Sequence, residues 1–108
     1  MPKLIRDKIP EIMCQNGQRV YMERAEPFRA FLRGKLNEES AELYNALYES
    51  ESDKPPFNAV YEEIADVLEV IDAIIKEYGL SKRIVRKTKR QKRKEKGSFD
   101  KKYVLLED

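Results

Sequence analysis

Two pairs of carboxylates have the spacing of metal ligands on helices. Glu39 and Glu42 form the first pair, and Glu63 and Asp66 form the second. Residues three positions apart project from neighbouring turns of the same face of a helix. If both segments are helical, each pair presents two hard oxygen donors in one direction, and such donors are the ones that Mg²⁺ and Mn²⁺ prefer. The chemistry that these residues indicate is the binding of a divalent cation.

Both pairs fall on the apolar side of their predicted helices. Placing successive residues at about 100° puts Glu39 and Glu42 within the apolar arc of the first long helix. On the second helix, Glu63 lies inside the arc and Asp66 lies on its rim. The alternative for one such motif is a solvated acidic face, but two motifs on apolar faces would bury like charges at a high cost unless a cation neutralises them. We therefore predict a Mg²⁺ site at these four residues, with Mn²⁺ as a possible substitute.

Two further charged residues lie beside these pairs. Glu38, at the edge of its apolar arc, is a candidate general base or additional ligand. Lys35, one turn before Glu39, either neutralises the carboxylates or binds a phosphate. Nucleophilic catalysis by Cys14 is not expected, because the chain contains no histidine to activate the thiol.

The elements that must position these groups are all helices. Patterns of apolar residues, Pro and Gly predict two long antiparallel helices, one from about residue 26 to 50 and one from about 56 to 78. Shorter helices are expected over residues 7–13 and 81–96, followed by a short extended segment or strand over residues 99–106. Gly34, within the first long helix, suggests a close contact with another helix.

The chain of 108 residues is expected to form one domain that assembles with copies of itself. The apolar arcs of the long helices are too wide to be covered by one short helix and a charged tail. We therefore predict a four-helix bundle in a homo-oligomer, a dimer or a tetramer. The oligomeric number stays open.

Charge is divided unevenly along the chain. Residues 1–81 carry 10 basic and 16 acidic groups, whereas residues 82–108 carry 12 basic and 4 acidic groups. The acidic body and the basic segment 82–108 indicate separate tasks, such as binding cations and binding anions. No apolar run is long enough for a membrane span, and no apolar signal core is present. With a single cysteine, these features favour a cytoplasmic protein without membrane partners.

At its carboxylates the sequence resembles the all-alpha NTP pyrophosphatases, the MazG-like superfamily. The similarity lies in the segment Lys35-Leu36-Asn37-Glu38-Glu39-Ser40-Ala41-Glu42-Leu43 and in Glu62-Glu63-Ile64-Ala65-Asp66-Val67-Leu68-Glu69-Val70. These contain E-x-x-E and, after a linker, E-x-x-D. The opening Lys3-Leu4-Ile5-Arg6-Asp7-Lys8-Ile9-Pro10-Glu11 is similar to a branch labelled phosphoribosyl-ATP pyrophosphohydrolase-like.

This resemblance implies a hydrolase that cleaves a nucleoside triphosphate to a monophosphate and pyrophosphate. It implies Mg²⁺ bound by Glu39, Glu42, Glu63 and Asp66, and attack by a metal-associated water. Glu38 or Glu39 would take the proton of that water. The branch has basic residues near its end, where this chain has Lys92 and Lys96, and we expect both to bind substrate phosphates beside Lys35.

Two other classes of protein remain as alternatives. One is a nucleic-acid-binding helical module that uses the basic segment 82–102, although this segment has few aromatic side chains for base stacking. The other is a helical interaction protein without catalytic activity. We do not expect nucleic acid to be the partner. The preferred base and sugar, the choice between a canonical nucleotide, a damaged nucleotide and phosphoribosyl-ATP, and the number of metal ions stay open.

Overall fold

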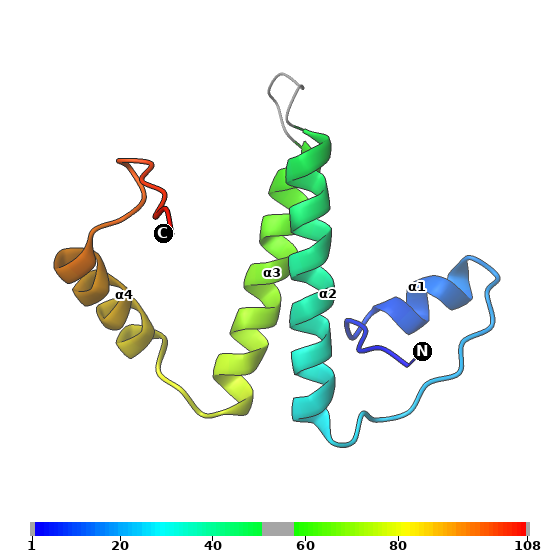
Figure 1. The fold of residues 1–108 in the computed structure, drawn as a ribbon. Coiled ribbons are helices and arrows are strands. Elements are labelled where there is room, and N and C mark those ends of the chain that lie inside the picture. The colour runs from blue at the N-terminus through cyan, green and yellow to red at the C-terminus, as the bar shows by residue number, and fades with distance from the viewer. Residues whose placement is uncertain (1, 51–57, 108) are drawn as a thin grey trace.

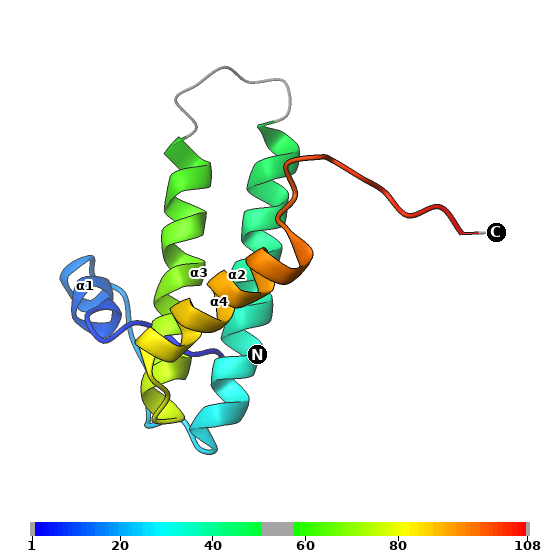
Figure 2. The ribbon, with the colours of Figure 1, turned by 90° about the vertical axis from the view of Figure 1, so that its left-hand side faces the viewer.

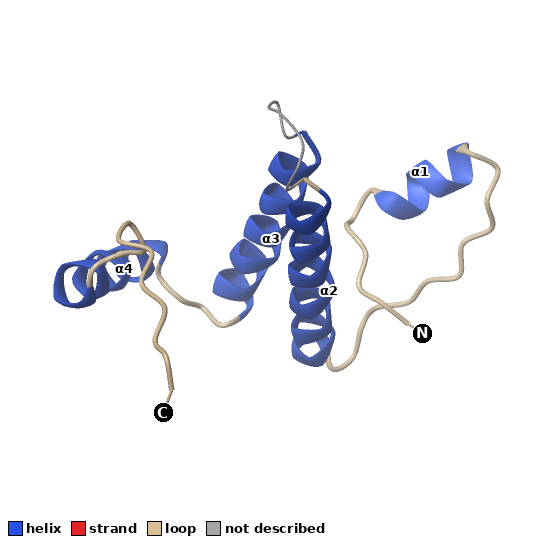
Figure 3. Ribbon diagram, turned by 45° about the horizontal axis from the view of Figure 1, so that its top comes forward, coloured by secondary structure: helices blue, strands red, loops and turns tan. Residues whose placement is uncertain are grey.

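The computed structural model describes residues 2–50 and 58–107, and the part that it describes is all-helical (Figures 1 and 3). Four helices follow one another: α1 (Ile9–Gln15), α2 (Phe28–Glu49), α3 (Asn58–Glu77) and α4 (Lys82–Lys96). Residues 51–57, where the linker and the start of the second long helix were predicted, lie outside the described residues. The predicted helix-rich fold class is confirmed, with helix ends close to the expected positions.

Local signals in the sequence account for the helix ends. Pro27, in extended conformation, precedes α2, and Gly79 adopts a positive φ of 62° directly after α3. Such a left-handed residue ends a helix at low cost only when it is glycine. Ser81 then caps α4, since its Oγ accepts a hydrogen bond of 3.2 Å from the backbone N–H of Ile84. The chain turn between α3 and α4 is therefore determined by residues 79–81.

The only extensive packing between helices in the described chain joins α2 and α3, which lie side by side (Figures 1 and 2). The buried apolar residues are few and belong to these two helices: Leu32, Ala46, Val70 and Ile75. Gly34 does not make the close helix contact that we expected, because a Cβ built there would meet nothing within 4 Å. The glycine lies instead beside a hollow at the surface of α2.

The chain as a whole is open rather than compact. Its radius of gyration is 17.9 Å, whereas a compact domain of this length has about 13 Å. Helices α1 and α4 stand away from the central pair on different sides (Figure 1). Every residue of α4 is exposed, and so is every residue of the following segment 97–107. That segment is an extended arm and not a strand.

Helix α3 and the residue after it carry a regular row of large apolar side chains, most of which are exposed. Tyr61, Ile64, Leu68, Ile71, Ile75 and Tyr78 follow one another at alternating spacings of three and four residues, the spacing of a coiled-coil seam. Ile75 is buried, whereas Ile64 is 43% exposed and Leu68 is 55% exposed. We call Tyr61, Ile64, Leu68 and Ile71 the apolar stripe. None of the described helices is long and apolar enough to cross a membrane.

Candidate metal centre

The two carboxylate pairs meet where α2 packs against α3. Glu39 and Glu42 come from α2, and Glu63 and Asp66 come from α3. One carboxylate oxygen from each of the four lies within 4.8 Å of the others. The helical spacing of three residues places each pair on one face, and the packing of the helices brings the two faces together. The predicted set of four side chains therefore converges at one place.

Burial distinguishes this cluster from an ordinary acidic surface. Glu39 is 6% exposed and is the one buried charged residue in the described part of the chain. Its Oε2 is buried and has no hydrogen-bond partner among the described residues, and the same holds for Oε2 of Glu63. A buried oxygen without a donor is costly, and the cost is greater when the oxygen carries charge. These two oxygens are therefore the atoms at which a bound cation would have the greatest effect.

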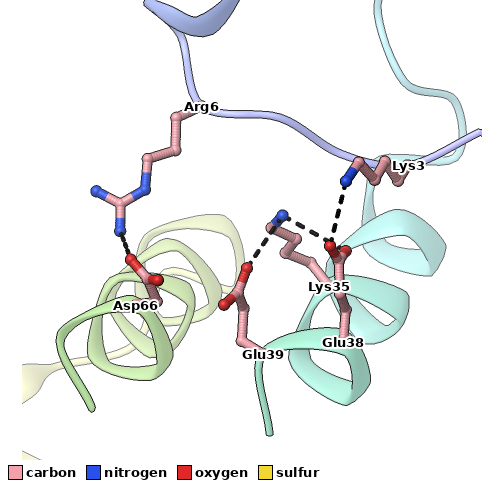
Figure 4. Close-up of polar contacts among 6 residues, drawn as sticks. All are labelled: Lys3, Arg6, Lys35, Glu38, Glu39 and Asp66. Carbon is pink, nitrogen blue, oxygen red and sulfur yellow. Dashed lines mark hydrogen bonds and ion pairs between the residues drawn. The ribbon is translucent and has the colours of Figure 1, made fainter. Parts of the chain in front are cut away.

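Basic side chains offset part of the negative charge (Figure 4). Lys35 Nζ lies 3.1 Å from Glu39 Oε1 and 3.4 Å from Glu38 Oε2. Desolvation disfavours the charge of Lys35, but its hydrogen bonds to both carboxylates and their negative charge outweigh this effect and raise its pKa. Lys35 thus stays cationic between α2 and the open side of the cluster. It is placed to neutralise the cluster, and it remains a candidate for phosphate binding.

The most exposed member of the cluster, Glu42, holds its proton unusually well. A hydrogen bond that its protonated form shares with Glu39 is the main cause, followed by desolvation and by the charges of Glu39, Glu63 and Glu38. Together they raise the pKa of Glu42 to about 7. Like charges that share one site hinder each other's ionisation in this way. Without a cation, the cluster therefore carries less than its full charge at neutral pH.

The size of the oxygen cage suits a small divalent cation. Ligand oxygens on opposite sides of an octahedral Mg²⁺ are roughly 4.2 Å apart, and around Ca²⁺ they are roughly 4.6–5.2 Å apart. The four oxygens lie within 4.8 Å of one another, so only a small contraction would close them around Mg²⁺ or Mn²⁺. All four donors are carboxylates, which suits these hard cations. The residues present fit the predicted metal.

The other predicted residues divide into two groups. Glu38 lies next to the cluster on α2, and Lys35 pairs with it, so both are near the carboxylates. Lys92 and Lys96 lie on the exposed helix α4, which stands away from α2 and α3 within this chain (Figure 1). The single chain does not bring these two lysines together with Lys35. Their assignment as phosphate-binding residues stays a prediction.

Two residues at the cluster were missed from the sequence. Arg6 Nη2 lies 2.6 Å from Asp66 Oδ1, and Lys3 Nζ lies 3.5 Å from Glu38 Oε1 (Figure 4). Both belong to a short segment before α1, far from the carboxylates in sequence. The order of Lys3-Leu4-Ile5-Arg6, with one basic residue on either side of two apolar ones, was a signal that the segment packs on the helices through its apolar residues. It does not indicate which carboxylates the basic residues contact.

Comparison with known proteins gives no further identification, since no family model, curated protein or solved structure matches the chain. The all-helical architecture is compatible with the resemblance noted in the sequence. The class of protein that fold and site define is thus an all-helical protein with an acidic cluster suited to a divalent cation.

The first prediction concerns the pH dependence of metal binding. Because a cation must displace the proton of Glu42, Mn²⁺ affinity should rise from pH 6 to pH 8, and binding near pH 6 should release a proton. Calorimetry in two buffers of different ionisation enthalpy measures that release. Glu42→Gln should abolish it, while Glu62→Gln, at an exposed position of α3, should leave it unchanged.

The first prediction extends to the stability of the metal-free protein, which should vary with pH in the opposite direction. The pKa of Glu42 is raised on folding, so this group favours the folded state below its ordinary pKa of 4.5, and the benefit is lost as the pH rises through about 7. Metal-free protein should therefore melt at lower temperature at pH 8 than at pH 6, with a smaller difference in Glu42→Gln. For the metal-binding measurement, an Mn²⁺ affinity that is the same at pH 6 and pH 8 would show that Glu42 is no ligand.

Proposed function

We propose that this protein is a Mg²⁺-dependent pyrophosphohydrolase that cleaves a nucleoside triphosphate to a nucleoside monophosphate and pyrophosphate. One observation carries the proposal: four carboxylates from two long helices converge around buried oxygens of Glu39 and Glu63 that have no partner. An acidic cluster that lies at a helix contact is costly without a counter-ion. A divalent cation there would neutralise charge, polarise phosphoryl oxygens and acidify water.

The residues of the chain have distinct roles in this proposal. Glu39, Glu42, Glu63 and Asp66 hold the cation. Glu38, whose side chain is 28% exposed and lies outside the set of four, is accessible to water and is one candidate for the base that takes the water proton. Glu39 is the other candidate, because only one of its oxygens contacts Lys35. The order of the motifs, E-x-x-E followed by E-x-x-D, supports hydrolysis of a phosphoric anhydride through the resemblance described above.

A second candidate function comes from α4. All its residues are exposed, including ten Lys and Arg side chains, so the helix could neutralise several phosphates of a nucleic acid in a salt-sensitive manner. Measuring pyrophosphate released from a panel of nucleotides with Mg²⁺ separates the enzyme from this binding module, and from an interaction protein that has no catalytic activity.

The second prediction concerns the proposed ligands. Glu39→Gln and Glu63→Gln should each lower hydrolysis at least a hundredfold, about 2.7 kcal/mol of transition-state stabilisation, and weaken Mg²⁺ binding. Helical content, measured by circular dichroism, should stay the same. In Glu63→Gln without metal the melting temperature should rise, because repulsion falls and Glu63 forms no ion pair with any described residue.

Glu62→Gln provides the matched control, because it makes the same chemical change at the neighbouring position, where the side chain is exposed. It should hydrolyse nucleotides at the unmodified rate. Full activity of Glu39→Gln or Glu63→Gln at saturating Mg²⁺ would exclude the proposed metal centre as the site of hydrolysis.

We further propose that α2 and α3 form an antiparallel pair that completes a four-helix bundle with a second copy of the chain. The apolar stripe of α3 supports this, because its spacing is that of a helix-packing seam and its side chains remain exposed. On α2, Leu47, Tyr44 and Tyr48 are exposed as well. A second copy would cover such a surface with identical helices and give the open chain a larger core.

The third prediction tests this assembly. Leu68→Glu places a charge in the middle of the apolar stripe and should convert the oligomer to monomers, measured by light scattering at micromolar concentration. Glu69→Lys changes charge at the adjacent exposed residue and should leave the oligomer intact. A monodisperse and active monomer of the unmodified protein would contradict the bundle.

The fourth prediction concerns the basic helix. We propose that in the oligomer α4 of one copy lies at the cluster of another, where phosphate donors are needed opposite the carboxylates. The double substitution Lys92→Ala with Lys96→Ala should lower kcat/KM at least tenfold, about 1.4 kcal/mol, with little change in Mg²⁺ affinity. Normal hydrolysis combined with loss of salt-sensitive binding to DNA or RNA would assign α4 to nucleic acid instead.

A further inference from the structure

The segment before α1 reaches the open side of the carboxylate cluster. We call residues 2–7 the N-terminal segment. Figure 4 shows it passing over both long helices, with Lys3 directed at Glu38 of α2 and Arg6 directed at Asp66 of α3. The contacts measure 3.5 Å and 2.6 Å. One short segment thus brings a cation to each of the two helices that hold the cluster.

The side chains of this segment differ in burial. Leu4 and Ile5 are partly buried, while Lys3 and Arg6 on either side of them are exposed. The side chains of Lys3 and Arg6 are 64% and 54% exposed. Ion pairs with such exposure contribute little to stability, and they can be exchanged for other ions at little cost. The partly buried Leu4 and Ile5 would hold the segment in place while its two cations change partners.

Asp66 is required for two different contacts. Its Oδ1 accepts a short hydrogen bond from Arg6, yet the same side chain belongs to the set of four carboxylates that fits a divalent cation. A guanidinium and a divalent cation repel each other, so they compete for this carboxylate. Cation binding would release Arg6 at the edge of the site. A guanidinium carries a planar fork of donors that matches two phosphate oxygens.

A hollow of about 360 Å³ has the cations of Lys3 and Lys35 in its wall. Gly34 and Lys35 of α2 form part of its wall, together with Lys3 and Phe31. The missing side chain of Gly34 leaves this wall open, since a Cβ there would meet nothing within 4 Å. Glycine lowers the stability of a helix interior, and here no close packing explains its presence. Lys35 and Glu38 line the hollow, and Lys35 also pairs with Glu39 of the cluster, so the hollow and the cluster are adjacent.

We propose that Lys3 and Arg6 are polyphosphate-binding residues, and that Arg6 exchanges Asp66 for a phosphate group when a divalent cation binds the cluster. The ligand class is a chain of phosphates carried with a divalent cation, as in a nucleoside triphosphate. The inference rests on the proposed function for the metal centre, and it adds a second function to the N-terminal segment: it neutralises the cluster before the ligand arrives and holds the ligand afterwards.

Two binding measurements on the full-length protein test the proposal without hydrolysis. The first is the binding of Mn²⁺ alone, monitored by electron paramagnetic resonance. Arg6→Gln should tighten it about threefold or more, because the competitor for Asp66 is lost. The second is calorimetric binding of inorganic tripolyphosphate at saturating Mg²⁺. Arg6→Gln should weaken it about tenfold or more and Lys3→Gln about threefold or more.

Two further variants control for charge and geometry. Lys8→Gln removes a positive charge from an exposed residue just after the segment and should change both affinities less than about twofold. Arg6→Lys retains the charge without the planar fork, so its tripolyphosphate affinity should lie between those of Arg6→Gln and the unmodified protein. Circular dichroism of every variant should show the same helical content as the unmodified protein.

The outcomes separate this inference from the proposed function. If the unmodified protein binds neither Mn²⁺ nor tripolyphosphate, the metal centre itself is wrong, and the present inference is overturned with it. If it binds both and Arg6→Gln leaves either affinity unchanged, the metal centre stands and the role of Arg6 is overturned. If Arg6→Gln loses helical content, its pair with Asp66 is a structural contact and the proposed exchange is overturned. Unchanged affinities in the folded Arg6→Lys variant would likewise overturn the proposal.

Discussion

Repulsion among four carboxylates at the contact between α2 and α3 is the constraint on which the rest of the structure depends. The helices bury Glu39 in the same interface that holds their small apolar core, so packing and charge repulsion act at one place. The chain offsets part of the repulsion with Lys35 and Arg6, and part by raising the pKa of Glu42 to about 7, so that this carboxyl is only partly ionised at neutral pH. Among the described residues, Oε2 of Glu39 and Oε2 of Glu63 still lack a hydrogen-bond donor. A divalent cation would neutralise these buried oxygens.

The open shape of the chain also bears on the proposed cation site. A site between helices needs an accessible side, and the exposed cations Lys3 and Arg6 of the N-terminal segment lie against Glu38 and Asp66 there. The cost of this openness is a small core, with few apolar residues fully buried. The exposed apolar stripe on α3 and the wholly exposed α4 are surfaces on which a second copy could supply the missing burial.

Much of the candidate site could be predicted because it depends on local geometry. Pro27, Gly79 and Ser81 act through their own backbone or side chain, so the limits of the helices followed from residue type. The spacing of three residues then placed each carboxylate pair on one helix face. The position of those faces relative to the apolar residues was sufficient to predict that the pairs would meet.

Contacts between distant residues were decided only by the tertiary structure. Arg6 and Asp66 are separated by 60 positions, and no helical period relates them, so their pairing depends on where the chain before α2 turns back. Gly34 suggested tight packing, but its surroundings are open. The cost of a glycine within a helix depends on that residue alone, whereas the side chains around it depend on the tertiary structure. The sequence by itself determined the helices and the carboxylate faces. The fold decided which cations oppose them, because an ion pair requires two side chains to meet in space.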